Sequence, residues 1–572
     1  MQLGAASSTA GRVALGLFVA LPFVLADGDH HDHHHGEAAA EHSHDDSDYP
    51  MTYFALPDFA GLIYAHIVLM TIAWVFVLPI AVMFSLARSR YTLGVQFVFL
   101  ATNALSILLV TIYNSKTPDL YPGNAHHHIG WIVTWVVSAQ TLVGLVGWIA
   151  GAVKAKKVRH SAEAHAFIPA SAEAHQFFSS DGYRLSDDSG QGTEPTTESL
   201  RSNSVSTLAE PGEAQAHAHG HHKEYDEDDL EELSLSDPPA KGRFALGAAK
   251  FVSSGVWRYL DLSYKLVDRI ILPFGFIAVL TGIVTYARFF EGHEIFSGLA
   301  HWIKGGVFFW LGLFTLGRWS GSFAELGWAW NARPKTTHKW RPSAEFVESA
   351  LIFVYGASNI FLEHLGSTDS AWSAQDLEHI AITVLFIGGG LSGMLIESTW
   401  IRDLLNAPVV QTVQDHAYSD VEREGLEPPE SYEFSINPIP ALVIMLLGTM
   451  MGSHHQAAAI SAMVHKQWGN LLLCASLARA FTYVLIYLKP PKSNLPSRPP
   501  TELLAAFGLI SGGIVFMASS SDTIEGMIHY DLDAMFMFTV TMGMVGLIMA
   551  WEVLVLALKG WATRKERFEA KY

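Results

Sequence analysis

The sequence of 572 residues contains a single cysteine, Cys474, and few charged residues. One cysteine cannot form an intramolecular disulfide, and it excludes both thiolate metal clusters and Cys-x-x-Cys redox chemistry. Asp, Glu, Lys and Arg make up only 16% of the residues, whereas a soluble chain usually carries about 25%. Long uncharged apolar runs account for this deficit, and such runs indicate membrane spans.

The chain also lacks a basic surface and the usual nucleotide-binding motifs. Its net charge is -19, and much of the acidity lies in residues 45–48 and 225–232, so nucleic acid is not an expected partner. There is no phosphate-binding glycine loop, no nucleophile elbow and no flavin or nicotinamide fingerprint. The sequence leaves open whether the protein is an enzyme.

Residues 1–26 are predicted to be a cleaved signal peptide. Arg12 precedes a short apolar run, Val13–Leu25, and Ala26 offers a small residue at the cleavage position. The run is too short to span a bilayer comfortably. We therefore expect the mature chain to begin in the lumen of the secretory pathway.

The apolar runs predict an all-α, polytopic transmembrane helix bundle whose main partner is the lipid bilayer. Each run is close to the roughly 20 residues that a helix needs to cross about 30 Å of hydrocarbon. The runs show no strand-like alternation, and only helices or closed barrels satisfy backbone groups in lipid. Eleven spans are predicted, at residues 59–86, 93–113, 128–153, 269–289, 301–318, 345–363, 378–397, 438–453, 467–488, 502–518 and 533–558.

Lys and Arg set the predicted orientation, because loops on the cytoplasmic side carry an excess of them. With a lumenal N-terminus and an odd number of spans, most Lys and Arg residues near the membrane fall in inner loops or in the C-terminal tail. We expect an integral protein of the endomembrane system or plasma membrane with a cytoplasmic C-terminus. The predicted regions after the signal are a His-rich lumenal tail (27–57), a three-helix unit (58–153), a disordered cytoplasmic linker (154–268), an eight-helix unit (269–558) and a basic cytoplasmic tail (559–572).

Most membrane-proximal histidines fall on the predicted outer side. Imidazole and carboxylate groups at converging helix ends can bind zinc or copper. The alternative is that these histidines, which are amphipathic, sit at the interface without a ligand. The proposed metal ligands in the eight-helix unit are Glu363, His364, His379, His454, His455, His465 and His529, and His293 and His301 bracket a neighbouring outer loop. The tail before the first span adds two histidine tracts, which we expect to collect metal ions without fixed geometry.

The segment from Ala65 to Pro79, which contains His66, resembles the first haem helix of cytochrome b561-type proteins. The later stretch His126–Gly130, followed by Gln140, resembles the third helix of that core. The resemblance implies one b-type haem held by His66 and one of His126, His127 and His128. The predicted second span contains no histidine, so a second haem is not supported. Retention of the fold without haem is the alternative.

The whole layout resembles the fungal Ytp-like family of membrane proteins. The residues that carry the likeness are Ile439–Ile444, Gly448–Gln456 and Val464–Gly469. This resemblance implies a fungal integral membrane protein but no particular reaction. Three hypotheses remain open: a haem or metal protein that uses the outer histidines, a metal-ion transporter or metal-binding module, and a non-catalytic membrane scaffold.

Arg479 lies well inside a predicted span, where an unpaired charge costs at least about 2.5 kcal/mol. Glu348, Glu397 and Glu552 lie at similar predicted depth. We expect one of them to pair with Arg479, either as a structural ion pair or as part of a gate or proton relay. Three small-residue motifs predict close helix packing. They are Gly147-x-x-x-Gly151, Gly389-x-x-x-Gly393 and Gly508-x-x-x-Gly512.

Overall fold

The computed structural model describes residues 50–165, 250–252, 255–291, 295–333, 342–362, 374–416, 428–453 and 458–569, together with residues 426 and 456. Throughout these residues the chain is helical or irregular, with no strand. The predicted signal peptide, most of the His-rich tail and residues 166–249 of the predicted linker lie outside the described residues.

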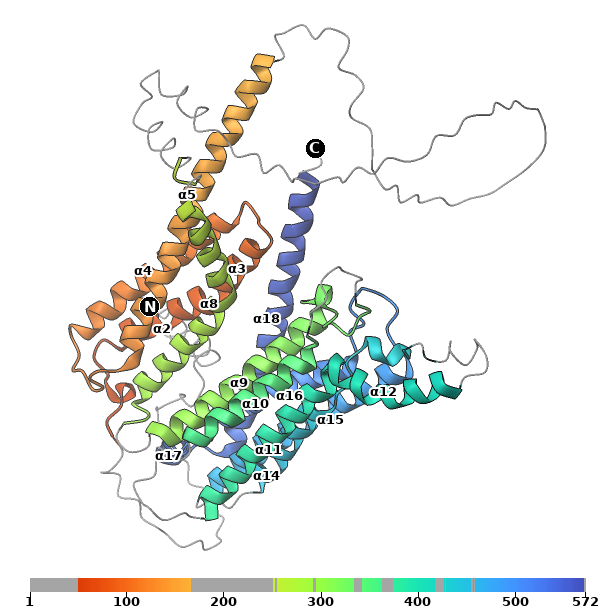
Figure 1. Cartoon of the computed structure of the whole chain (residues 1–572). Helices are drawn as coiled ribbons and strands as arrows, with labels where there is room; N and C mark the ends of the chain where they lie inside the picture. Colours follow the sequence, from red (N-terminus) through yellow and green to blue (C-terminus); the bar gives the residue numbers. More distant parts are fainter. Residues whose placement is uncertain are drawn as a thin grey trace, which may run out of the picture. The chain divides into compact units, whose positions relative to one another are not determined.

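Figure 1 shows how the helices of the described residues are arranged. In chain order they are α2 (Ala60–Thr71), η2 (Ile72–Val77), α3 (Leu78–Leu86), α4 (Thr92–Asn114), α5 (Ala125–His165), α8 (Gly255–Ala287), α9 (Ile295–Ser320), α10 (Ala344–Leu362), α11 (Ala374–Glu397), α12 (Thr399–His416), α14 (Ile439–Gly452), α15 (Ala459–Leu488), α16 (Pro500–Met517), α17 (Ser521–His529) and α18 (Ala534–Glu569). Short 3-10 turns at Tyr53–Ala55, Ala324–Leu326 and Glu430–Glu433 complete the set.

The prediction of a helical membrane protein with many spans is confirmed. In the part of the chain that the structure describes, nine helices are long and apolar enough to cross a membrane. The other two predicted spans, 345–363 and 438–453, form α10 and α14. Helix α14 has 14 residues, which gives a length of about 21 Å, short of the roughly 30 Å hydrocarbon layer. The count of eleven spans stays a prediction.

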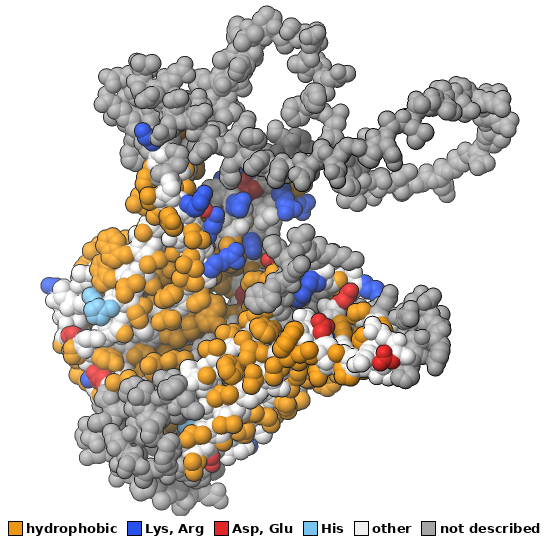
Figure 2. All heavy atoms as spheres, viewed as in Figure 1, with side chains coloured by type: hydrophobic (Ala, Val, Ile, Leu, Met, Phe, Trp, Pro, Cys, Tyr) orange, Lys and Arg blue, Asp and Glu red, His pale blue; other side chains and the backbone are white. Residues whose placement is uncertain are grey.

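Hydrophobic side chains cover the outside of the helices (Figure 2). Leu351 and Val354 on α10 are 61% and 60% exposed, and Phe481 on α15 is 63% exposed. An apolar surface of this extent is unfavourable in water and marks contact with lipid or partner chains. The outward faces of these helices are therefore the lipid-facing surface that the composition predicts.

Two predicted boundaries differ from the structure. Helix α5 continues to His165 and α8 begins at Gly255, so both ends of the predicted linker 154–268 are helical where the structure describes them. Likewise α18 runs to Glu569 through most of the predicted tail. Extending an existing helix needs no new nucleus, so helices continue past the point where charged residues end an apolar run. Residues 142–264 form a compact unit of their own, separate from residues 1–141 and 265–572.

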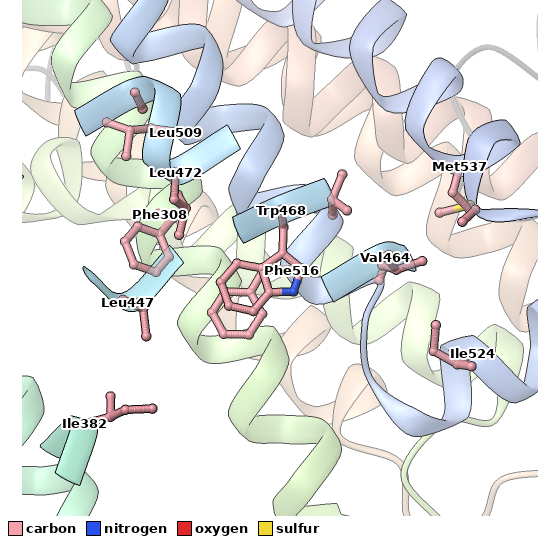
Figure 3. Close-up of a cluster of buried hydrophobic side chains, with 14 of the residues drawn as sticks. Phe308, Ile382, Leu447, Val464, Trp468, Leu472, Leu509, Phe516, Ile524 and Met537 are labelled. Atoms are coloured by element: carbon pink, nitrogen blue, oxygen red, sulfur yellow. The ribbon is translucent and has the colours of Figure 1, made fainter. Parts of the chain in front are cut away.

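The core of the eight-helix unit is centred on two stacked aromatic rings. Trp468 of α15 and Phe516 of α16 lie with ring centroids 4.0 Å apart and nearly parallel (Figure 3). Leu447, Leu472 and Leu509 belong to the same buried cluster, which joins α9, α11, α14, α15 and α16. Such offset ring pairs add about 0.5–1.5 kcal/mol beyond the area that they bury.

Glycines let the backbones of these helices touch. A Cβ on Gly305 of α9 would collide with the carbonyl oxygen of Gly513 on α16, and the reverse is also true. Gly448 of α14 and Gly469 of α15 face each other in the same way. Close approach of small residues drives helix association in lipid, where apolar burial contributes little between helices.

The first span contains a π-helical segment, Ile72–Val77, directly before Pro79. Proline has no N–H, so it cannot donate the usual helical hydrogen bond to the carbonyl of Val75. The indole Nε1–H of Trp551 on α18 donates to this carbonyl oxygen at 2.9 Å. A membrane interior offers no water to replace such a bond, so the last helix of the chain completes the backbone bonding of the first.

We expect Trp551→Phe to lower the free energy of unfolding by about 1 kcal/mol, because it keeps the ring but removes the donor to Val75. Unfolding of the detergent-solubilised protein followed by circular dichroism would measure the change. Trp561→Phe on the same helix is the control, since Trp561 stacks on Tyr91 and its indole donates no hydrogen bond to any of the described residues. Equal stability of the Trp551 variant and the native protein would contradict this role.

Candidate functional sites

His66, the predicted haem ligand of the first span, is buried with 7% of its surface exposed. Its Nδ1 lies 3.0 Å from the carbonyl oxygen of Ser106 on α4 and 2.9 Å from the Ser106 hydroxyl. A carbonyl oxygen only accepts, so a ring that bonds to it carries its proton on Nδ1. The Nε2 lone pair is then the one available for a ligand, as metal-binding histidines require.

Among the three predicted partners of His66, only His126 turns toward the interior. Its Nδ1 lies 3.3 Å from the Thr281 hydroxyl of α8, and its ring rests against Gly282, where a Cβ would lie 3.1 Å from the imidazole. His127 and His128 are exposed. Of the four predicted haem ligands, His66 and His126 are therefore the two whose rings face the interior.

Several buried polar side chains of the same unit hydrogen-bond to one another. Gln140 of α5 donates to Asp268 of α8 at 2.7 Å, and the Ser85 hydroxyl donates to the other Asp268 oxygen at 2.6 Å. The Trp74 indole donates to Asn103 at 3.0 Å. Gln140 thus anchors a buried carboxyl group that links α3, α5 and α8.

In the eight-helix unit the structure brings together His465 of α15, a predicted ligand, and His301 of α9. Their ring centroids are 5.9 Å apart and the rings are nearly perpendicular. His465 is 3% exposed, and its Nδ1 lies 2.8 Å from the carbonyl oxygen of Ser461 one turn earlier in α15. The rings of Trp468 and Phe516 pack against this pair.

Among the described residues, none of the other predicted ligands joins this pair. His379 lies in the second turn of α11, and His529 ends α17 with its ring 4.7 Å from that of Tyr530. Glu363, His364, His454 and His455 lie outside the described residues. Within the described residues, no three His, Cys, Asp or Glu side chains are grouped as a metal site would require.

Arg479 has the acidic partner that the sequence predicts. Its Nη1 lies 3.1 Å from Glu348 Oε2 of α10, which confirms one of the three proposed carboxylates. Its Nη2 also lies 3.0 Å from Glu502 of α16 and donates to the Thr315 hydroxyl of α9 at 2.8 Å. The Arg479 residue is 6% exposed, so this pair is shielded from water.

A second guanidinium completes the cluster. Arg318 of α9 is 2% exposed and pairs with Glu345 and Glu348 at 3.0 Å each. Its Nε donates to the Trp328 carbonyl at 2.7 Å, and its guanidinium lies 4.2 Å from the centre of the Trp330 ring. Glu348 therefore bridges both arginines, and four helices meet at one set of buried charges. We call Arg318, Glu345, Glu348, Arg479 and Glu502 the buried charge cluster.

The other two carboxylates proposed for Arg479 lie elsewhere. Glu397 accepts hydrogen bonds from Ser343 at 2.6 Å and Ser435 at 2.7 Å. Glu552 on α18 lies beside Gly317, and its Oε2 has no hydrogen-bond partner among the described residues. The pairing of Glu348 depends on the α10–α15 packing, which residue depth alone cannot specify.

Sequence reasoning missed Arg318, Glu345, Glu502 and His301 as site residues. Arg318 and Glu502 stand at the ends of predicted spans, where a charge usually reaches water. The signal that could have identified them is charge balance, because Arg318 and Arg479 would need several carboxylates at one level. His301 was noted only as a neighbour of an outer loop, and its pairing with His465 requires α9 and α15 to pack against the same helix, α16.

The sequence matches known families over most of its length. Residues 274–560 match the family described as Protein YTP1-like, C-terminal, and residues 47–150 match a domain of unknown function, DUF2427. The uncharacterized membrane protein C3B8.06 of Schizosaccharomyces pombe is 33% identical over 518 residues, covering 88% of this chain and 94% of that protein.

Two proteins of Saccharomyces cerevisiae are also similar. The uncharacterized membrane protein YCR061W is 34% identical over 368 residues, which cover 60% of this chain and 57% of that protein. Protein YTP1 is 23% identical over 256 residues, covering 44% and 45% of the two chains. No solved structure matches the chain.

We expect Arg479→Leu to lower the free energy of unfolding by about 3–5 kcal/mol, because it leaves Glu348 and Glu502 buried beside a missing cation. Combined with Glu348→Gln, the loss should be smaller than the sum of the single losses by at least about 1 kcal/mol. Combined with Glu552→Gln, the two losses should simply add. Chemical unfolding of the single and double variants measures both couplings, and additivity of Arg479 with Glu348 would contradict the pairing.

Proposed function

This chain belongs to the family of YTP1-like membrane proteins, and we propose that it binds a transition-metal ion through histidines at one end of its eight-helix unit. The observation that carries this proposal is the pairing of His301 with His465. Two imidazoles on one zinc ion hold their ring centres roughly 5–6.5 Å apart, given Zn–N bonds of about 2.0 Å. The separation of 5.9 Å falls in this range.

The environment of His465 fits a ligand. Its Nδ1–H is held by the Ser461 carbonyl oxygen, and this second contact fixes the orientation of a metal-binding ring and places the lone pair on Nε2. The aromatic rings of Trp468 and Phe516 pack against the pair. An imidazole-dominated donor set suits zinc or copper(II) rather than magnesium or calcium.

A metal site needs three or four donors, and two are present among the described residues. We propose that His454 and His455 add to them. The chain enters this dipeptide from Gly452, where a Cβ would lie 3.9 Å from the His465 carbonyl oxygen. His364 is the further donor that the sequence offers, and the histidine tracts before the first span would deliver ions to this end.

The arrangement of charges supports the proposed orientation. The histidine pair lies at the ends of α9 and α15 opposite to those that lead to Arg333 and Lys489. By the positive-inside rule, the histidine end faces the lumen or the cell exterior and the C-terminus lies in the cytosol. The described donors support a metal-binding or metal-sensing module. Transport and a purely structural role are the alternatives.

Purified protein should contain close to one equivalent of zinc or copper at this site. Any further metal bound by the N-terminal histidine tracts should be lost when those tracts are deleted. We expect His465→Ala to abolish the thermal stabilisation that added Zn²⁺ produces in a chain without residues 27–49. His128→Ala is the control, because that histidine is exposed. Metal content by mass spectrometry and a thermal shift of the same samples give independent readouts, and an unchanged shift in the His465 variant would overturn the proposal.

A second proposal is a single b-type haem between His66 and His126. It is favoured by the anchoring of each ring through Nδ1, to Ser106 and Thr281 respectively. Two neutral imidazoles from different helices form a complete axial ligand set, which supplies one-electron chemistry when haem is bound. His66 and His126 would then hold the haem iron, while Ser106 fixes the proton position on His66.

Protein purified from cells supplied with haem precursors should show a reducible b-type absorption band. We expect His66→Ala and His126→Ala each to remove the band, because both axial positions depend on these rings, while His127→Ala keeps it. A native protein without the band, at full haem supply, would remove this second proposal and leave the metal proposal standing.

A further inference from the structure

Helix α18 carries two different faces where it extends beyond the bundle. One face, formed by Trp561, Lys565, Glu566 and Glu569, packs on the turn before α4. Glu566 accepts hydrogen bonds from Ser89 and from the Arg90 backbone N–H at 3.1 and 3.0 Å, and Glu569 pairs with Arg90 at 2.6 Å. Lys565 donates to the Tyr91 hydroxyl at 2.7 Å, and this hydrogen bond lowers the pKa of Tyr91. All acidic residues of this last part of α18 are thus used on that face.

The opposite face lines a cavity of about 760 Å³ with the end of α9 and the turn that follows it. Positions 556, 559, 560, 563, 564, 567 and 568 recur at intervals of three and four, so they form one stripe on the helix. Every charged side chain in the lining is a cation. The lining residues are Ser320, Gly321, Ser322, Leu556, Lys559, Gly560, Thr563, Arg564, Arg567 and Phe568.

These cations have no acidic partner within the part of the chain that the structure describes. Arg564 instead lies over the Phe568 ring at 5.8 Å. The Ser320 hydroxyl, also in the lining, is shielded from solvent and has no hydrogen-bond partner among the described residues. Glu552 lies about one turn deeper than Leu556 on the same helix and is not part of the lining. The cavity therefore combines uncompensated positive charge with an unused hydrogen-bond donor.

We propose that this cavity binds the phosphate group of an anionic lipid headgroup. Lys559, Arg564 and Arg567 supply the charge, and Arg guanidinium groups match phosphate oxygens with paired hydrogen bonds. Ser320 and Thr563 supply neutral donors to the same oxygens. Leu556 and Phe568 offer apolar contact for the start of the acyl chains. The position suits a lipid, because α18 crosses from hydrocarbon to water here and Lys and Arg gather around its end (Figure 2). Basic pockets at this level attract anionic lipids of the cytoplasmic leaflet.

The test uses the full-length protein in nanodiscs of phosphatidylcholine with or without phosphatidic acid. Native mass spectrometry should show phosphatidic acid retained by the native protein. Arg564→Gln combined with Arg567→Gln should weaken retention at least about tenfold, because the variant loses both guanidinium charges and their charge-assisted hydrogen bonds to phosphate. Arg564→Lys combined with Arg567→Lys keeps the charge and should lose much less.

Arg269→Gln is the matched control, since Arg269 is an exposed cation on α8 and does not line the cavity. A parallel arm adds glycerol phosphate to protein in neutral nanodiscs and reads the thermal unfolding midpoint. If phosphatidic acid raises the unfolding midpoint and glycerol phosphate does not, the cavity is assigned to lipid. If glycerol phosphate raises the midpoint equally, the same phosphate site is assigned to a soluble ester. Equal retention of phosphatidic acid by the native protein and the double Gln variant, with unchanged gel-filtration profiles, would overturn the proposal.

Discussion

The eight-helix unit depends on one constraint, which is that charges buried away from water must be paired with opposite charges. Two guanidiniums, Arg318 and Arg479, meet three carboxylates in the buried charge cluster, and Glu348 touches both cations. Separating any of the contributing helices would leave an ion in a medium that solvates it poorly. The cluster therefore fixes α9, α10, α15 and α16 in one register. The cluster contains three carboxylates but only two guanidinium groups. One oxygen of Glu502 has no hydrogen-bond partner among the described residues.

The two ends of the bundle have different chemistry around this centre. Toward one end, the Trp468–Phe516 stack leads to the His301–His465 pair. Toward the other lie the cationic face of α18 and Glu397, which accepts hydrogen bonds from Ser343 and Ser435. Glycine contacts such as Gly305 with Gly513 hold the helices between these ends at backbone distance. A rigid middle of this kind keeps imidazoles from distant segments in place, which a loop-based site would not.

The sequence predicted the features that depend on local composition. It did not predict the residue pairings that depend on how the helices pack. Apolar runs located the helices, and the depth of Arg479 predicted its pairing with a carboxylate, Glu348 being one of three choices. Arg318 and Glu502 were missed because a charge at a span end normally reaches water, and only the neighbouring helices enclose these two. The pairing of His301 with His465 joins residues 164 positions apart and needs the α9–α15 arrangement. Helices α8 and α18 also extend beyond the predicted spans, to Gly255 and Glu569, because helices continue past their apolar segments.

The bond from Trp551 to Val75 has a consequence for how the protein is made. The first span emerges from the ribosome with a carbonyl that Pro79 cannot satisfy, and its donor is encoded more than 470 residues later. Until α18 has been synthesised and inserted, the N-terminal unit carries an incompletely bonded backbone inside the bilayer. Chains that stop before Trp551 lack this donor. An early helix therefore depends on a late one, so the first span reaches its final backbone bonding only after α18 has inserted beside it.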